Sequence, residues 1–180
     1  MNAPHRPAPP AALETERLDI RSATPDDVER LQRVFTAAGD HFLTVTGRPQ
    51  PDPDAAEREI RGSQATPGRD VAIFTLRETG EDVGAAGWWS GSPEPDVALL
   101  GMLTVDVAHR RTGIAREALA ALEVWLAGHG VRRIRSGVGA GDEKSQEILR
   151  GLGFAPLDER RHVALDRGRV MIALFEKEIG

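Results

Sequence analysis

The sequence contains no cysteine and no tyrosine, and lysine occurs only at positions 144 and 177. Without cysteine the chain can form no disulfide, no thiolate metal site and no cysteine nucleophile. No apolar run is as long as a membrane-spanning helix, and the Pro/Ala-rich first twelve residues lack the apolar core of a secretory signal. We therefore expect no membrane partner and a cytoplasmic location.

Acidic residues outnumber basic ones, 28 to 23. The net charge of −5 argues against a general nucleic-acid binder, because such proteins carry a basic stripe or a high isoelectric point. There is no Walker-type glycine-lysine-Ser/Thr motif, and the five histidines are too dispersed to predict a metal centre. We expect neither a nucleic-acid partner nor a metal.

A chain of 180 residues can form one domain that buries roughly 70% of its unfolded surface. Residues 1–12 are predicted to be a flexible tail, because proline and alanine dominate them. Residues 13–180 are predicted to be a single domain.

The stretch from Leu99 to Ala127 organises the rest of the chain. It begins with an apolar run, 99–107, that is too short for a typical helix and is predicted to be a strand. A polar turn, His109 to Gly113, follows and carries three potential cations. A helix is predicted next, because apolar residues recur at helical spacing: Ile114, Ala118, Leu122 and Trp125.

The start of that helix is suited to phosphate. The first backbone N–H groups of a helix have no intrahelical acceptor, and the helix dipole places partial positive charge there. Gly113 allows a ligand to approach the backbone closely, and Ala115 adds almost no side chain. Arg110, Arg111 and Arg116 are expected to add mobile positive charge. The alternative is an ordinary connection with solvated arginines.

Two motifs resemble the GCN5-related N-acetyltransferase (GNAT) superfamily. Arg110-x-x-Gly113-x-Ala115 is similar to its coenzyme A pyrophosphate loop, Gln/Arg-x-x-Gly-x-Gly/Ala. The segment from Asp142 to Phe154 is similar to its fourth-helix motif, which usually begins with Asn, carries Tyr and ends in Gly-Phe. The resemblance, with the order of elements, covers about residues 15–176.

The fold expected from this pattern is α/β (α+β), with a mixed, mostly antiparallel seven-stranded sheet and about four helices on its two faces. The strands are predicted at 17–21, 71–76, 83–89, 99–107, 131–138, 160–165 and 170–176. Helices are predicted to begin near Thr24, Ala55, Ile114 and Asp142, and residues 166–168 to form the turn of a closing hairpin.

The resemblance implies a site for acetyl-CoA. Its pyrophosphate would lie on backbone amides from Arg111 to Ala115, and its pantetheine arm along a strand that diverges from its neighbour at a bulge. The residues implied to bind the coenzyme are Leu103, Thr104, Val105, Arg110, Arg111, Thr112, Gly113, Ile114, Ala115, Arg116, Asp142 and Ser145. Asp142 has a simpler role open to it as the cap of the fourth helix.

The catalytic acid and base are not evident from the motifs. Leu99 stands where some family members have a glutamate base, and Leu149 stands at the tyrosine position. Asp96 and His41 are the candidate bases, with Asp40 a further one, and each also has a surface or structural role open to it. A water molecule or Ser145 could assist the thiolate, which is itself a fair leaving group.

The function implied is transfer of an acetyl group directly from acetyl-CoA to a primary amine of a small molecule or protein. Residues 40–54 are expected to help select the acceptor, and the superfamily precedent allows a homodimer. The alternative is a non-catalytic acyl-CoA-binding sensor or interaction module, because the usual acid and base are missing. A dinucleotide site at Gly137-x-Gly139 is disfavoured, because Asp142 replaces its third glycine.

Overall fold

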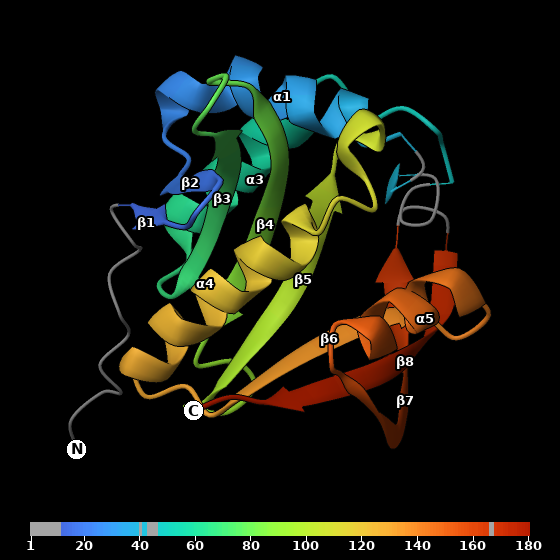
Figure 1. The fold of residues 1–180 in the computed structure, drawn as a ribbon. Coiled ribbons are helices and arrows are strands. Elements are labelled where there is room, and N and C mark those ends of the chain that lie inside the picture. Colours follow the sequence, from blue (N-terminus) through green and yellow to red (C-terminus); the bar gives the residue numbers. More distant parts are fainter. Residues whose placement is uncertain (1–11, 40, 43–46, 166–167) are drawn as a thin grey trace.

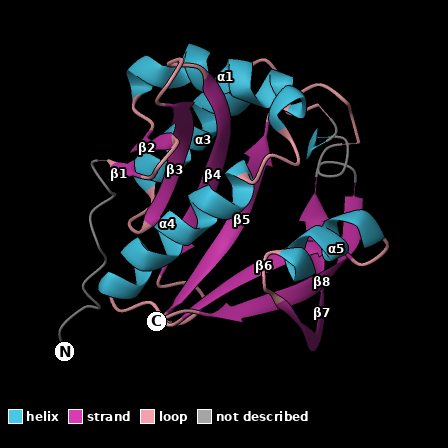
Figure 2. Cartoon of the chain, viewed as in Figure 1, coloured by secondary structure: helices cyan, strands magenta, loops and turns pink. Residues whose placement is uncertain are grey.

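The computed structural model describes residues 12–39, 41–42, 47–165 and 168–180, and Figures 1 and 2 show how their elements are arranged. The strands are β1 (Leu13–Glu14), β2 (Leu18–Ser22), β3 (Arg69–Leu76), β4 (Asp82–Ser90), β5 (Val97–Val105), β6 (Arg133–Gly139), β7 (Ala155–Leu165) and β8 (Gly168–Glu178). The helices are α1 (Val28–Ala37), α3 (Ala55–Ala65), α4 (Ile114–Gly128) and α5 (Glu143–Gly151), with two 3-10 helices, η1 (Pro25–Asp27) and η2 (Val107–His109).

The strands form one mixed sheet in the order β1-β2-β3-β4-β5-β6-β8-β7. Every neighbouring pair is antiparallel except β5 and β6, which α4 connects as a parallel crossover. The mixed, mostly antiparallel architecture is therefore confirmed. The described residues contain eight strands, one more than predicted, because β1 has only two residues and is too short to show a periodic pattern.

Most predicted strand boundaries differ from the observed ones by a few residues, and two of these differences have a visible local cause. The organising strand ends at Val105, because the Asp106 side chain accepts a hydrogen bond from Ala108 N and begins η2. In the closing hairpin, β7 begins at Ala155 and reaches its partner through an irregular register between Pro156 and Arg160. The first two residues of the predicted hairpin turn, 166 and 167, lie outside the described residues, as does most of the predicted tail.

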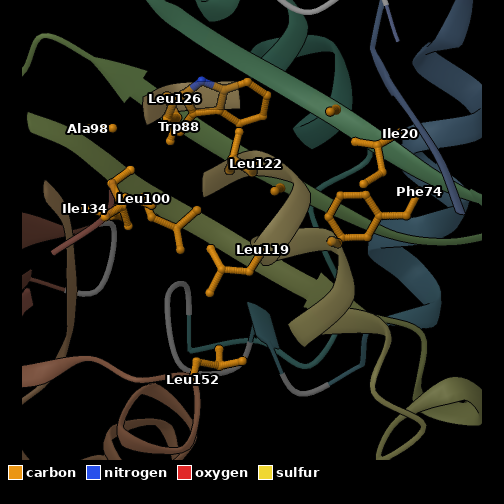
Figure 3. Close-up of a cluster of buried hydrophobic side chains, with 14 of the residues drawn as sticks. Ile20, Phe74, Trp88, Ala98, Leu100, Leu119, Leu122, Leu126, Ile134 and Leu152 are labelled. Atoms are coloured by element: carbon orange, nitrogen blue, oxygen red, sulfur yellow. The ribbon is translucent and has the colours of Figure 1, made fainter. Parts of the chain in front are cut away.

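Helices cover both faces of the sheet, as expected. On one face, Leu119 and Leu122 of α4 pack in a buried cluster with Phe74, Trp88 and Leu100, and Figure 3 shows this core in close-up. On the other face, α1 and α3 bury a second cluster that includes Phe35 and Ile60. None of the described helices is long and apolar enough to cross a membrane.

Candidate active site

The predicted coenzyme loop lies between the end of β5 and the first turn of α4. After η2 the backbone adopts a positive φ twice, at Arg111 (62°) and at Gly113 (87°). Gly113 is the N-cap of α4 and has no side chain to hydrogen-bond the helix amides. An L-residue with a side chain is strained at such a φ, which explains glycine at this position.

The first turn of α4 presents unpaired hydrogen-bond donors. Among the residues that the structure describes, none accepts a hydrogen bond from the backbone N–H groups between Gly113 and Arg116. The N–H of Glu117 is the first to be bonded, to Gly113 O at 3.0 Å. With the positive end of the helix dipole, these amides form a site that suits an anion such as phosphate.

The three arginines of this region differ in what they contact. Arg110 donates to Val105 O and to Ala38 O, so its guanidinium joins the end of β5 to the C-terminal carbonyls of α1. Arg116 donates to Gly151 O at 2.7 Å and joins α4 to the end of α5. Both guanidinium groups are held in place, contrary to the expectation of mobile charge. In the described part of the chain, Arg111 is exposed and has no side-chain partner.

β5 and β6 separate beside this loop, which leaves part of β5 without a strand neighbour. The parallel pairing of β5 and β6 runs only from Val97–Arg133 to Leu100–Ser136, and a register shift between β4 and β5 follows at Gly101. Beyond this point β6 pairs with β8 alone, and Figure 1 shows β5 and β6 diverging from their common starting point. Consequently, the main chain of β5 from Gly101 to Val105 lacks a strand partner on its β6 side within the described sheet.

The side chains of the predicted pantetheine segment point into the protein. Leu103 and Val105 pack in the core beneath α4, and Thr104 is buried. A ligand beside this unpaired part of β5 would therefore meet the main-chain groups of these residues. This arrangement agrees with the role that the sequence resemblance gives to the backbone here.

A family model described as an acetyltransferase (GNAT) domain matches residues 17–155. The chain belongs to the GNAT acetyltransferase family. A comparison with curated proteins found no match.

Solved structures of GNAT-like acetyltransferases share the fold. An acetyltransferase from Thermus thermophilus is 24% identical, with a TM-score of 0.72, and the match covers 93% of this chain and 99% of that one. A probable GNAT acetyltransferase from Chromobacterium violaceum is 21% identical, with a TM-score of 0.81 and coverage of 95% and 87%. RimL, a ribosomal L7/L12 alpha-N-protein acetyltransferase solved with coenzyme A, is 15% identical, with a TM-score of 0.74 and coverage of 93% and 98%.

The candidate bases of this GNAT protein lie in different places. Asp96 directly precedes β5, so about 16 Å of extended strand separates it from Gly101, where the unpaired part of β5 begins. Arg133 Nη2 lies 3.0 Å from both Asp96 carboxylate oxygens, and these hydrogen bonds lower the pKa of Asp96. Neither its position nor its pKa favours Asp96 as the proton acceptor.

The second candidate base, His41, packs edge-to-face on Phe42, with ring centroids 5.2 Å apart. Asp40 lies outside the described residues, as do residues 43–46 in the predicted acceptor segment. The structure therefore gives His41 an aromatic neighbour, and its catalytic role stays a prediction.

The fourth-helix motif has a structural role at its first residue. Asp142 is the N-cap of α5, accepting hydrogen bonds from Ser145 N at 3.1 Å and from Ser145 Oγ at 2.6 Å. Leu149, at the family's tyrosine position, is buried in the core. Asp142 thus caps α5, and the Ser145 hydroxyl donates a hydrogen bond to the Asp142 carboxylate.

His109, which the sequence placed beside the coenzyme loop, bridges two acids. Its Nδ1 lies 3.3 Å from Asp106 Oδ2 and its Nε2 lies 3.7 Å from Glu81 Oε2. The ligand atoms of these side chains lie within 4.8 Å of one another, but the two ring nitrogens face different carboxylates. A metal binds one imidazole nitrogen at a time, so this geometry suits a bridge between η2 and the β3–β4 turn.

Sequence reasoning missed one group of residues at this site. Arg17 and Thr15, in the turn between β1 and β2, contact Glu117 in the first turn of α4. The residues are about a hundred positions apart in the chain, so no local motif links them. An acidic residue in the first turn of a helix, such as Glu117, also interacts favourably with the helix dipole. That common role explains its presence, so nothing in the sequence pointed to a further contact.

Proposed function

We propose that this protein transfers an acetyl group from acetyl-CoA directly to a primary amine. The observation that carries the proposal is the row of unpaired amides at the start of α4, which follows the part of β5 that has no pairing with β6. These amides suit the pyrophosphate, and the unpaired main chain of β5 suits the pantetheine arm and the thioester carbonyl. Membership of the GNAT family supports the same assignment.

In the proposed reaction a neutral amine attacks the thioester carbonyl carbon. The new C–N bond forms as the carbonyl π electrons move to oxygen, where main-chain N–H groups of β5 stabilise the charge. The C=O double bond then re-forms from the oxygen electron pair as the C–S bond breaks, and the coenzyme leaves as a thiolate. Because the chain has no tyrosine and Leu149 is buried, water takes the amine proton and protonates the thiolate.

Leu99 replaces the glutamate base, and Asp96 lies about 16 Å along the strand from Gly101. Neither position supplies a base at the unpaired part of β5, so acceptors with a low amine pKa are favoured. At pH 7.5 roughly a third of α-amino groups are neutral, whereas roughly 0.1% of lysine side chains are. An α-amine therefore needs little help to lose its proton. Two proteins of the same fold are named as modifying the N-terminus of ribosomal protein L7/L12, which is an acceptor of this kind.

The proposal is tested by measuring acetyl-CoA affinity by calorimetry and thiol release with two peptides. One peptide has a free N-terminus and no lysine, and the other has a blocked N-terminus and one lysine. We expect saturable binding of acetyl-CoA but not NADH, and a higher kcat/KM for the free N-terminus, with one acetyl group added by mass. Failure to bind acetyl-CoA, or binding without product from any amine, would contradict the proposal.

A matched pair of glycine variants locates the binding site. Gly113 and Gly130 both have a φ of 87°, but only Gly113 lies at the start of α4, and Gly130 follows its end. Gly113→Glu places a negative charge over the amides, where like charges about 4 Å apart repel by about 4 kcal/mol at an effective dielectric constant of about 20. We expect at least a hundredfold loss of acetyl-CoA affinity (about 2.7 kcal/mol) for Gly113→Glu and no comparable loss for Gly130→Glu. Equal affinities in the two folded variants would place the coenzyme elsewhere.

A further inference from the structure

The turn between β1 and β2 is joined to the first turn of α4 by side-chain contacts. Glu117 accepts hydrogen bonds from Thr15 Oγ1 at 2.5 Å, from Arg17 N at 2.9 Å and from Arg17 Nε at 2.6 Å. Arg17 Nη2 also lies 2.6 Å from Glu117 Oε2. Both carboxylate oxygens of Glu117 are therefore occupied by this turn. Burial raises the pKa of Glu117, but these contacts outweigh it and leave the pKa lowered.

Arg17 also reaches the coenzyme loop itself. Its Nη1 donates to Thr112 O at 2.9 Å, in the peptide unit that joins Thr112 to Gly113. A Cβ added at Gly113 would lie 3.3 Å from Arg17 Nη2, so the guanidinium lies against the loop backbone. The Arg17 side chain thus contacts both Glu117 on α4 and the Thr112 carbonyl in the loop.

This contact determines where the next amide points. In a planar trans peptide the C=O and the N–H point in opposite directions. Because Arg17 holds the Thr112 carbonyl on its own side, the N–H of Gly113 faces away from Arg17. That N–H is the first of the unpaired donors at the start of α4.

The charge of Arg17 is balanced by that of Glu117 at short range. The pair therefore adds little net charge to the anion site, whose donors are main-chain amides. An arginine that binds phosphate directly leaves its guanidinium unpaired with protein carboxylates, so that its charge and donors can meet the phosphate oxygens. The contacts of Arg17 indicate that it acts through the shape of the loop.

We propose that Arg17, held by Glu117, is a positioning residue that orients the coenzyme loop for the pyrophosphate; this rests on the proposed function. The N-terminal turn from Thr15 to Leu18 is then part of the coenzyme site, although it is far from the loop in sequence. Arg17 therefore raises the affinity for ligands that carry the pyrophosphate and leaves the affinity for ligands without it unchanged.

The experiment compares Arg17→Gln, Glu117→Gln and the double variant with wild type. Affinities are measured for coenzyme A and 3′-dephospho-coenzyme A, and kcat/KM is measured with S-acetylpantetheine, which lacks the pyrophosphate. We expect about a tenfold loss of affinity for both coenzymes, the size of one hydrogen bond to a charged group, and less than a twofold change with S-acetylpantetheine. The double variant should lose little more than either single variant, since the two side chains act as a unit.

Two further variants separate positioning from charge and from folding. Arg17→Lys keeps the charge but cannot reach both Glu117 and Thr112 with one ammonium group, so we expect it not to restore affinity. Arg61→Gln removes an exposed arginine that pairs with Glu57 on α3, and we expect wild-type coenzyme affinity. Thermal unfolding of each variant confirms that the protein tested is folded.

Three outcomes would overturn the inference. Full affinity in folded Arg17→Gln, or full rescue by Arg17→Lys, would show that the loop does not depend on this geometry. A loss confined to coenzyme A and absent for the 3′-dephospho form would make Arg17 a direct ligand of the 3′-phosphate. Failure of the wild type to bind any coenzyme A species would instead refute the proposed function, and this inference with it.

Discussion

Replacing Asp70 with asparagine exchanges a buried carboxyl for a neutral amide of nearly the same shape. Asp70 lies on β3 and is only 6% exposed. Its Oδ2 accepts from Ser22 Oγ at 2.6 Å and its Oδ1 accepts from Val71 N at 2.8 Å. An asparagine can accept from Val71 N and donate to Ser22 Oγ, so the substitution removes the charge and preserves both contacts.

Burial raises the pKa of Asp70 from 3.8 to about 6, against the two hydrogen bonds that lower it. The folded protein therefore binds this proton more tightly than the unfolded chain does. The resulting stabilisation is fully present below pH 3.8 and is lost as the pH rises through about 6. A shift of this size corresponds to about 3 kcal/mol, of which about 2.5 kcal/mol is lost between pH 4 and pH 8.

The assay is urea unfolding of wild type and Asp70→Asn at pH 4 and pH 8, with Asp158→Asn as a control for losing an exposed charge. We expect the free energy of unfolding of Asp70→Asn, relative to wild type, to rise by about 2.5 kcal/mol between pH 4 and pH 8. The control should show a much smaller change. Equal pH dependence in wild type and Asp70→Asn would refute the reasoning, because Asp70 would then not titrate differently in the folded state.

Two further predictions concern stability. Gly84→Ala should lower the free energy of unfolding by about 3 kcal/mol, because its Cβ would lie 2.7 Å from Thr104 O and from Phe74 Cδ2. Gly87→Ala, whose Cβ would have its nearest contact at 3.6 Å, should lower it by less than about 1 kcal/mol. Denaturant unfolding measures both values, and similar losses in the two variants would contradict this prediction. Arg30→Ala should lower the free energy of unfolding by about 2 kcal/mol at pH 7, because Arg30 Nη2 lies 2.7 Å from Asp82 Oδ1. Burial raises the pKa of Asp82, but its hydrogen bonds and the charge of Arg30 together outweigh burial and leave that pKa lowered. That contribution is lost as the pH falls below 3.8, so the wild type and Arg30→Ala should converge in acid, and a constant difference would contradict the assignment.

Local signals predicted several structural features of the candidate coenzyme site. The start of α4, its capping glycine and the Asp142 cap all depend on residues within one helical turn, so the sequence shows them directly. The mixed, mostly antiparallel sheet and the helices on both faces followed from the alternation of apolar patterns and from the family resemblance, whereas the strand order came only from the structure. The short β1 was missed because two residues show no period.

The contacts of the arginines could not be predicted in this way. Arg110 meets Ala38 at the end of α1, and Arg116 meets Gly151 at the end of α5. In the sequence both looked like solvated cations beside a phosphate loop, because nothing local indicates a distant helix end. The ion pair that lowers the pKa of Asp96 likewise depends on the parallel pairing of β5 with β6, which brings Arg133 to it.

The sequence by itself determined that α4 begins with unpaired amides, because helix geometry leaves these donors free wherever a helix starts without a capping side chain. The tertiary structure decided what surrounds them. The divergence of β5 from β6 leaves the main chain of β5 unpaired beyond Leu100, and the packing of the β1–β2 turn on α4 brings Arg17 against the loop. Such contacts join segments about a hundred residues apart, and only the packed fold brings them together.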